Sequence, residues 1–371
     1  SCEYYSSQIR PAKSEVVLSP TSSLTNLPRN FTANAFVIAS SHHPHDHAIR
    51  EVQKQHHIDL VRSVGVYAYE SNKIFTRRGI YLPNLFLSEL RPDSSCPRDK
   101  VTLGNISSMH PSKGPHHVVM LSSTLVLNQK GPILEFLGSK ALYGINNKPN
   151  VADAKKNRRL ASAIKLLTSK YVQGNIVFSG LITGALGSHL DRWRFGIQNP
   201  LGFGEADPAS VKDCIGRGVP VFSSGFFGMW DYMRLFPETR AFWPRTLRRK
   251  TRKILNDAHL EKKLREKCFL LAVNMELRNK EILETWKSLI LNCGSLPAAN
   301  GQTFYPSGVS RTDRVIIKAV STLLYSKKVA AIILGVADRA YFAILWVDHH
   351  LYRIRECTRK DKYAGRLSPY N

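Results

Sequence analysis

Residues 174–180 read Gly-Asn-Ile-Val-Phe-Ser-Gly, and this stretch decides the predicted fold. Asn175–Ser179 has the length and apolar character of a buried strand. A helix with one apolar stripe is predicted before it, beginning at Asp153 and ending at Gln173-Gly174. A helix that ends at glycine and leads into a buried strand is half of an α/β unit. The apolar positions of the helix have helical spacing: Leu160, Ala163, Ile164, Leu167 and Tyr171.

The pattern of strand and helix returns in the second half of the chain. Phe269–Asn274 is an apolar run of strand length, and a helix is predicted over residues 279–290. Tyr305-Pro306 leads into a further helix, which starts with Ser310 and Asp313 at the spacing of a capping box. The residues expected to face the core from these two helices are Ile282, Leu283, Trp286, Leu289, Ile290, Val315, Ile316, Ala319, Val320, Leu323 and Leu324.

Together these segments resemble the universal family of small-subunit ribosomal proteins numbered two in bacteria. The matching segments follow the family's order: Val151–Asn157, Gly174–Gly180, Ser224–Asp231, Phe269–Asn274 and Thr303–Gly308 with Asp313. The resemblance covers about half of the chain. It implies an α/β fold with a three-layer core, Rossmann-like or flavodoxin-like, in which helices flank a parallel sheet.

The resemblance also implies a division of the chain and a function. Residues 1–115 would be an irregular extension with a few strands, 116–325 the core, and 326–371 a basic C-terminal extension, with a basic helical insertion at about 237–268. The implied function is that of a structural constituent of the mitochondrial small ribosomal subunit, because long extensions and eroded motifs are common in mitochondrial members. The implied partners are small-subunit rRNA and other mitochondrial ribosomal proteins. We expect no enzymatic activity, catalytic residue, metal, cofactor, membrane partner or small-molecule substrate.

The charge of the chain supports a polyanionic partner. Lys and Arg number 53 against 28 Asp and Glu, which gives a net charge of +25. Such an excess is typical of proteins that bind RNA, DNA or an anionic membrane surface. Pro244 begins a predicted basic helix, Arg192 and Arg194 flank Trp193, and a second cationic cluster lies near the C-terminus. The residues predicted to contact rRNA are Arg192, Arg194, Arg245, Arg248, Arg249, Lys250, Arg252, Lys253, Arg353, Arg355 and Arg359.

The histidines suggest an alternative function. Ser41–His47 contains four histidines and Asp46, and Asp348-His349-His350 follows an apolar run. Both segments resemble motifs of the phosphoesterases named for Asp-His-His, which use bound metal ions. That function requires His43, His45, Asp46, Asp348 and His349 to converge on one site. We favour the ribosomal interpretation because the two segments are far apart and the intervening aspartate motif is not evident. A basic RNA-binding assembly factor outside the ribosome is the other alternative.

The remaining segments give weaker predictions. Val66–Tyr69 and Val118–Leu127 are predicted strands, and Gly180–Pro220 is predicted to be rich in loops. Gly202-Phe203-Gly204 lacks the third glycine of a dinucleotide fingerprint, so no bound nucleotide is predicted there. The cysteines form no Cys-x-x-Cys pair, which favours buried free thiols. No uninterrupted apolar run of about 18 residues occurs, so no membrane-spanning segment is predicted.

Overall fold

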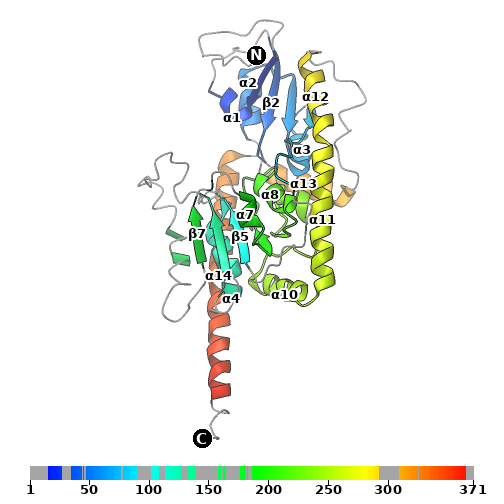
Figure 1. Cartoon of the computed structure of the whole chain (residues 1–371). Helices are drawn as coiled ribbons and strands as arrows, with labels where there is room; N and C mark the ends of the chain where they lie inside the picture. The colour runs from blue at the N-terminus through cyan, green and yellow to red at the C-terminus, as the bar shows by residue number, and fades with distance from the viewer. Residues whose placement is uncertain are drawn as a thin grey trace.

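The computed structural model of this chain contains two parallel β-sheets, one above the other in Figure 1. It describes residues 16–26, 35–43, 45, 47–76, 78–90, 102–107, 113–126, 133–138, 158–159, 162–163, 176–180, 182, 186–291, 309–324 and 326–364, with residues 22 and 356–364 described as backbone only.

The first sheet has four parallel strands in the order β1-β2-β3-β4. Alternate residues of a strand point to opposite faces. Ile38 of β2 therefore packs on one side with Ile282 and Leu289, whereas Val37 and Ala39 pack on the other side against the helices that flank β2. The elements of this half are β1 (Val16–Pro20), α1 (Thr21–Leu24), β2 (Phe36–Ser41), α2 (Ala48–Gln55), β3 (Leu60–Ser63), α3 (Val66–Asn72) and β4 (Gly79–Tyr81).

The second sheet has five parallel strands in the order β7-β6-β5-β8-β9. The chain enters at the central strand, moves outward to β7, and then returns to the other side of β5 to form β8 and β9. The direction of winding thus reverses between β5 and β8, which is the switch point where open α/β sheets bind ligands. The elements are β5 (Thr102–Ile106), α4 (Pro115–Val126), β6 (Ile133–Leu137), β7 (Ile176–Gly180), α7 (Leu186–Leu190), β8 (Phe195–Ile197), α8 (Ala209–Gly216) and β9 (Val221–Phe222).

The remaining helices join the two halves. α11 packs on α8 of the second half and leads to α12, which covers the first sheet, so the chain returns to the half where it began (Figure 1). α13 packs on α3, and α14 packs on α4. These elements are η2 (Phe227–Met229), α9 (Trp230–Met233), α10 (Pro244–Leu255), α11 (Ala258–Leu277), α12 (Asn279–Leu291), α13 (Arg311–Leu323) and α14 (Lys327–Ala364).

The centre of the second half is built around Trp193, whose side chain is fully buried. A Cβ on Gly104 of β5 would lie 1.9 Å from the indole ring, so this position needs glycine. The indole Nε1 donates to Glu135 of β6 at 2.7 Å, and Ser179 of β7 donates to the same carboxylate at 2.6 Å. The buried Trp193 is therefore a core residue that joins β5, β6 and β7.

Several sequence predictions are confirmed. A strand lies at β7, as the apolar run Asn175–Ser179 predicts. Pro244 begins α10, and Ser310 caps α13 by accepting the N–H of Asp313 at 3.0 Å. Helix α12 lies where it was predicted. Cys214 and Cys268 are buried free thiols.

Three predicted strands are wrong, because each lies in a helix. Val66–Tyr69 lies in α3, Val118–Leu127 overlaps α4, and Phe269–Asn274 lies inside α11. An apolar run of this length fits a buried strand and a buried helix equally well, and periodicity alone does not separate them. In α4 almost every residue is buried, so the helix lacks the polar face that would have identified it.

Two further predictions about the second half are wrong. Gly180–Pro220 contains α7, β8 and α8, so it is part of the core rather than a loop-rich insertion. In α13 the buried positions are Ile317 and Ser321, whereas Val315, Ile316 and Leu323 are exposed. The helix is rotated relative to the predicted orientation because its polar Ser321 faces α3. The Ser321 hydroxyl donates to the Ser71 hydroxyl there at 2.9 Å.

The N-terminal third of the chain is more regular than the irregular extension with a few strands that the sequence predicts. A four-stranded sheet lies within residues 16–81, and the expected boundary at residues 115 and 116 falls at the start of α4. The predicted helix from Asp153 to Tyr171 lies outside the described residues except at 158–159 and 162–163, which are helical. Val151–Asn157 and Thr303–Gly308 also lie outside the described residues.

Helix α14 bears on the expectation that no segment of the chain spans a membrane. Within the part of the chain described above, Lys327–Arg355 is long and apolar enough to cross a membrane by length and composition. The search for an uninterrupted apolar run missed it because Asp338 and Arg339 lie in its middle.

Candidate functional site

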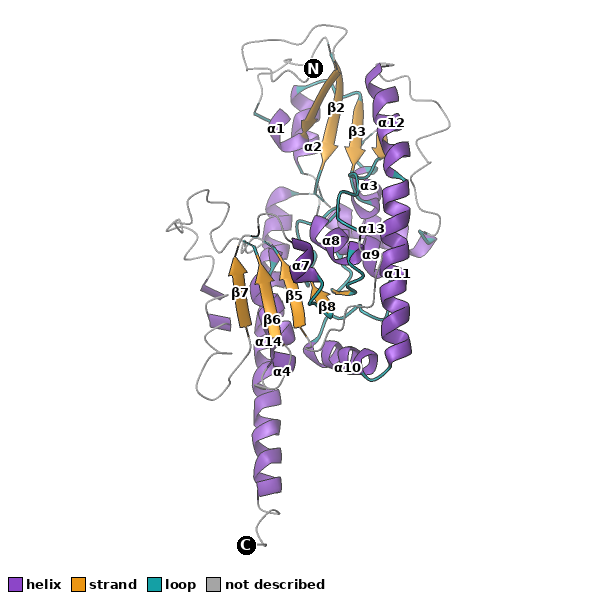
Figure 2. Cartoon of the chain, viewed as in Figure 1, coloured by secondary structure: helices purple, strands orange, loops and turns teal. Residues whose placement is uncertain are grey.

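The carboxyl ends of the two sheets face each other. In Figure 2 the arrowheads of β2 and β3 point toward those of β5, β6 and β7. At the junction, a Cβ on Gly65, which follows β3, would lie 1.9 Å from the carbonyl oxygen of Ala206, which follows β8. The two halves therefore meet backbone against backbone at the ends where parallel sheets bind ligands.

Asp231 of α9 fixes this junction. Its carboxylate accepts the backbone N–H of Val66 at 2.7 Å and of Tyr67 at 3.1 Å, which caps the N-terminus of α3. Burial raises the pKa of Asp231 to about 7, and the nearby charge of Asp207 acts in the same direction, although the two N–H bonds lower the pKa.

The loop after β8 has a conformation that depends on its glycines. Asn199 has φ 21°, and its side chain accepts the N–H of Gly202 at 3.0 Å and donates to the Phe203 carbonyl at 2.9 Å. Gly202 has φ 70°, and a Cβ there would lie 2.2 Å from the Phe226 carbonyl oxygen. Gly202 is therefore required both by backbone conformation and by close approach of the loop after β9.

Lys113 and Glu205 meet across the switch point. Lys113 follows β5 and precedes α4, Glu205 follows β8, and Lys113 Nζ lies 2.9 Å from Glu205 Oε1. The first turn of α4 adds backbone N–H groups that a helix leaves without internal acceptors. A cation beside a helix N-terminus at the first βα turn of such a sheet is suited to bind a phosphate or diphosphate.

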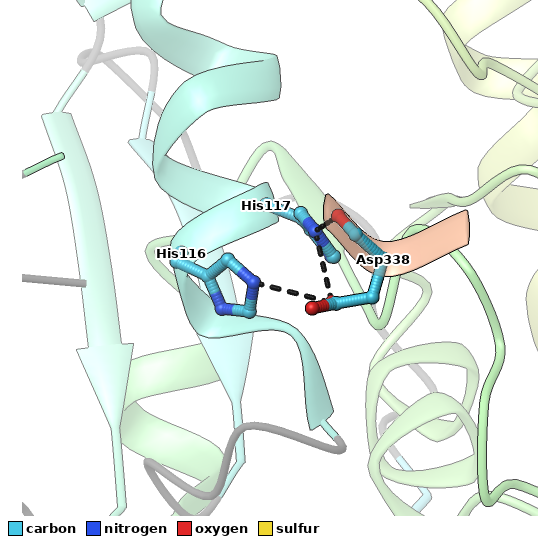
Figure 3. Close-up of side chains that lie close together, drawn as sticks. All are labelled: His116, His117 and Asp338. Atoms are coloured by element: carbon cyan, nitrogen blue, oxygen red, sulfur yellow. Dashed lines mark hydrogen bonds and ion pairs between the residues drawn. The ribbon is translucent and has the colours of Figure 1, made fainter. Parts of the chain in front are cut away.

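His116 and His117 lie in the first turn of α4 and face Asp338 of α14 (Figure 3). His116 Nε2 lies 3.4 Å and His117 Nε2 3.3 Å from Asp338 Oδ1. Burial, together with the neighbouring His116, lowers the pKa of His117 to about 3, so its imidazole is neutral. Burial alone would raise the pKa of Asp338, but bonding to His116 and the charges around it keep this pKa below its ordinary value.

The three side chains could hold a divalent metal ion, because their ligand atoms all lie within 4.8 Å of one another. Arg159 already forms an ion pair with Asp338. A bound cation would have to displace this guanidinium, so in the present geometry Asp338 of α14 contacts the two imidazoles of α4 and the guanidinium of Arg159.

An apolar cavity of about 620 Å³ lies beside the switch point. Its walls come from the loops after β8 and β9, from α3, and from α13 and α14. Only two of the lining side chains, Arg240 and Asp313, are charged. The lining residues are Tyr67, Leu201, Phe203, Gly225, Phe226, Phe227, Trp230, Arg240, Phe242, Trp243, Asp313, Ile316, Ile317, Val320, Ala337, Ala340, Tyr341 and Ile344.

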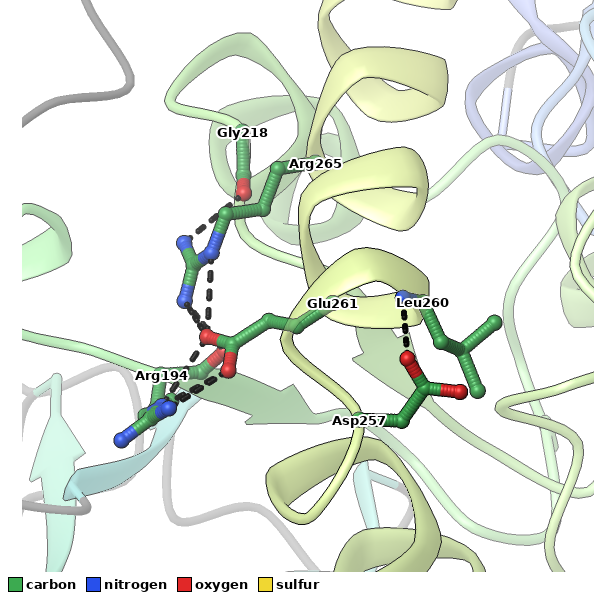
Figure 4. A network of polar contacts seen from close by, with 6 residues as sticks. All are labelled: Arg194, Gly218, Asp257, Leu260, Glu261 and Arg265. Atoms are coloured by element: carbon green, nitrogen blue, oxygen red, sulfur yellow. Dashed lines mark hydrogen bonds and ion pairs between the residues drawn. The ribbon is translucent and has the colours of Figure 1, made fainter.

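The arginines predicted to flank an RNA-binding tryptophan bind protein carboxylates instead. Arg194 donates to Glu261 of α11 through Nε at 2.9 Å and through Nη2 at 2.5 Å (Figure 4). Arg265 Nη2 donates to the same carboxylate at 2.7 Å. Hydrogen bonding to Glu261 raises the pKa of Arg194. Arg192 Nη2 lies 3.2 Å from Glu135, although most of its side chain is exposed. Arg194 therefore joins β8 to α11.

The other predicted cations occupy two helices. On α10, Arg248 lies over the ring of Tyr352 at 4.4 Å, and Lys250 donates to the Pro237 carbonyl at 2.6 Å. Arg245, Arg249, Arg252 and Lys253 are exposed on the same helix. Arg353, Arg355 and Arg359 lie on α14, and the side chain of Arg359 is outside the described residues.

The histidines of the proposed phosphoesterase motifs do not form a metal site in the described part of the chain. His45 lies 3.1 Å from the Ser71 hydroxyl and packs edge-on against Phe227. His349 is buried in α14, where burial lowers its pKa to about 4. Of the described residues, only His116, His117 and Asp338 form a group with metal-ligand spacing, so His43, His45, Asp348 and His349 do not converge; Asp46 lies outside the described residues.

Solved structures with the same arrangement identify the fold. TarM of S. aureus, crystallised with α-GlcNAc-glycerol and UDP, matches with a TM-score of 0.57, 14% identity, and coverage of 76% of this chain and 56% of that one. The fold is that of GT-B glycosyltransferases. The pneumococcal O-GlcNAc transferase GtfA, with UDP and GlcNAc, gives 0.53, 13% identity, and coverage of 76% and 57%. Anabaena HepE, with UDP-glucose, gives 0.56, 14% identity, and coverage of 74% and 79%.

This chain spans little more than half the length of TarM and of GtfA. No family model matches its sequence, and no curated protein matches it by sequence.

The match corrects the resemblance to a ribosomal protein. TarM, GtfA and HepE are glycosyltransferases, and each was crystallised with UDP or UDP-glucose. This overturns the predictions of a ribosomal constituent without enzymatic activity, of rRNA and ribosomal partners, and of no small-molecule substrate. It also gives no support to the phosphoesterase. The matches in the sequence arose because both folds alternate helices with parallel strands. The predicted mitochondrial location stays a prediction.

Sequence reasoning missed the site although its residues were visible. Gly202-Phe203-Gly204 lacks the third glycine of a dinucleotide fingerprint, and the sequence shows no clean strand before it. The strand β8 is only three residues long, Phe195–Ile197, and it follows a tryptophan flanked by arginines. Lys113-Gly114-Pro115 is a further signal, since proline at the first helical position predicts a helix start after a basic residue.

Proposed function

We propose that this chain is a glycosyltransferase that moves a sugar from a nucleotide-sugar donor to an acceptor hydroxyl. The observation that carries the proposal is the position of Lys113 and the α4 N-terminus at the switch point, opposite the first sheet. The fold resembles that of structures that contain UDP or UDP-glucose, and by this analogy we choose a nucleotide-sugar as the donor.

We read each half as a three-layer, Rossmann-like unit. In the second half the strand order matches the first five strands of the dinucleotide-binding sheet, and α4 is the helix of its first βα turn. The donor's diphosphate would lie against this helix start, with Lys113 neutralising charge. Glu205 keeps Lys113 at this position through their ion pair before a donor binds.

The proposed reaction exchanges one bond at the sugar's anomeric carbon for another. The acceptor oxygen forms a bond to this carbon, while the bond between the carbon and the phosphate oxygen breaks. The nucleoside diphosphate leaves with the electron pair, and the acceptor proton passes to a base or to water. Negative charge grows on the leaving diphosphate, so Lys113 and the α4 N–H groups would stabilise the transition state more than the bound donor.

Donor binding tests the proposal. UDP-glucose and UDP-GlcNAc are titrated into the purified chain by calorimetry, and we expect at least one of them to bind. Lys113→Met should weaken binding about tenfold or more, because a hydrogen bond to a charged group contributes about 1.5–3 kcal/mol. Lys287→Met, on the exposed face of α12, is the matched control and should bind as wild type. Equal affinity of wild type and Lys113→Met would reject the assigned diphosphate site.

A further inference from the structure

The cavity beside the switch point is built for an apolar ligand. Both of its charged side chains already have partners on the protein: Arg240 Nε donates to the Ser224 carbonyl at 2.7 Å, and Asp313 accepts from the Ser310 hydroxyl at 2.8 Å. The other lining residues are aliphatic or aromatic side chains and one glycine. A sugar ring in this cavity would leave most of its hydroxyls without partners, whereas a hydrocarbon chain requires none.

One wall of the cavity continues onto the outer surface. Ile316 of α13 and Ile344 of α14 line the cavity and are still 55% and 46% exposed. They lie at the rim, so an apolar ligand can extend from the cavity to the exposed side of these helices. The volume of about 620 Å³ is within the range of cavities that enclose small ligands.

The exposed side of α14 is apolar along most of its length. Large apolar residues recur at helical spacing and are exposed: Val329, Ile332, Val336, Val347, Leu351 and Ile354. Only 17% of the most apolar window of Lys327–Arg355 is buried inside the protein. In Figure 1 the lower part of this helix extends beyond the two sheets. The opposite side is fixed to the protein by Tyr341, whose hydroxyl donates to the Phe242 carbonyl at 2.6 Å.

The ends of this apolar surface are suited to the interface of a bilayer. Lys327 and Lys328 lie at one end, and Arg353 and Arg355 at the other, with Trp346 exposed between them. Lysine and arginine flanking an apolar helix bind anionic headgroups, and tryptophan is enriched at the level of the headgroups. The net charge of +25 also favours binding to an anionic membrane surface.

We propose that α14 lies along a membrane surface and that the adjoining cavity receives the hydrocarbon chain of a lipid from that membrane. The lipid is then the acceptor of the reaction: its chain fills the cavity and its hydroxyl-bearing headgroup lies toward the switch point. This assignment of the acceptor rests on the proposed transfer function, whereas the binding of the lipid chain does not. A second copy of this chain could cover α14 but would leave the cavity unfilled.

Binding of a hydrocarbon chain is tested with cis-parinaric acid, a fatty acid whose fluorescence rises in apolar surroundings. Trp230 and Trp243 line the cavity, so excitation of tryptophan should transfer energy to a bound probe. Replacing both Ala337→Phe and Ala340→Trp fills the cavity and should weaken probe binding at least about tenfold. The control Ala331→Trp adds a tryptophan at an exposed position of α14 that does not line the cavity and should have no effect. Unchanged probe binding in the filled variant would overturn the cavity assignment.

Membrane binding is tested by flotation of the full chain with two kinds of vesicle. We expect binding to phosphatidylcholine vesicles that contain phosphatidylglycerol, and weaker binding to phosphatidylcholine alone. Ile332→Asp with Val347→Asp should abolish flotation, whereas Leu283→Asp, on exposed α12, should not. Absence of flotation by wild type, or a stable dimer that the double variant converts to monomer, would overturn the membrane assignment.

Failure of this inference can be told apart from failure of the transfer function. Donor titration is performed without vesicles, and the Ile332→Asp, Val347→Asp variant should bind UDP-sugars as wild type does. Lipid and vesicle binding without donor binding would reject the transfer function and leave the lipid site standing. Donor binding without lipid binding would reject the lipid acceptor alone.

Discussion

Replacing Asp231 by Asn should change the pH dependence of stability more than stability itself. The carboxylate accepts two backbone N–H groups at the start of α3, at 2.7 and 3.1 Å. An amide oxygen can take the place of one carboxylate oxygen, so Asp231→Asn should lose one of these bonds. Loss of a helix cap costs about 1 kcal/mol. We expect a destabilisation of this size under mildly acidic conditions, where the buried carboxyl is protonated.

The pH dependence follows from the pKa of the same group. Burial raises it from 3.8 in the free residue to about 7. Between these values the folded state binds a proton that the unfolded state does not, so stability falls as pH rises, by about 1.4 kcal/mol per unit. The stability that protonation of Asp231 contributes is fully present below the pKa of this group in the unfolded state. It is lost as the pH rises through the pKa of the group in the folded state. Asn cannot titrate, so the stability difference should shift by about 2–3 kcal/mol in favour of Asp231→Asn between about pH 5 and pH 8, from a cost of about 1 kcal/mol to a net stabilisation of about 1–2 kcal/mol.

Urea denaturation of both proteins at these two pH values measures the effect. Asp257→Asn is the matched control, because Asp257 caps α11 by accepting the N–H of Leu260 at 2.9 Å from an exposed position. A difference between wild type and Asp231→Asn that stays the same at both pH values would show that Asp231 is not held in a raised-pKa environment.

Four further substitutions test the packing in and around the site. Gly202→Ala should cost about 2–3 kcal/mol by denaturation, because φ is 70° and the new Cβ meets the Phe226 carbonyl; Gly204→Ala, with φ 73° and open space, should cost about 1 kcal/mol. Glu261→Ala should cost about 3–5 kcal/mol in urea unfolding, since it leaves Arg194 and Arg265 without their shared anion, and a neutral result would mean that β8 is not joined to α11 in this way. Asp338→Ala should lower the unfolding temperature, because the buried His116 and His117 and the ion-paired Arg159 lose their common partner; an unchanged temperature would contradict the contact between α4 and α14.

The fold class was predictable from sequence because strands such as Ile176–Gly180 are short and apolar and follow a segment whose apolar spacing predicts a helix. The number of sheets could not be predicted from the sequence. Four strands of the first half lie in segments where the sequence shows little periodicity, and β3 contains Arg62, a charge that is uncommon in a buried strand. Its guanidinium is satisfied by the Leu82 carbonyl and by Ser40 and Asn84, partners that become neighbours only after folding.

The site was lost for a related reason. Charged residues were interpreted as surface contacts, yet Arg194 is paired with Glu261 across the fold, and no local pattern connects positions so far apart. Lys113 and Glu205 likewise become neighbours only because β5 and β8 are adjacent in the sheet. Glycines required by close approach, such as Gly65 and Gly202, cannot be distinguished in the sequence from glycines in ordinary turns.

The central claim, sugar transfer from a nucleotide donor, is tested most directly by measuring release of UDP from UDP-glucose and UDP-GlcNAc. The full chain is incubated with each donor in the presence of vesicles made from extracted membrane lipids. The account predicts that UDP accumulates, that labelled sugar appears in the lipid fraction, and that Lys113→Met reduces the rate at least about tenfold while Lys287→Met does not. Folded protein that releases no UDP from either donor would contradict it.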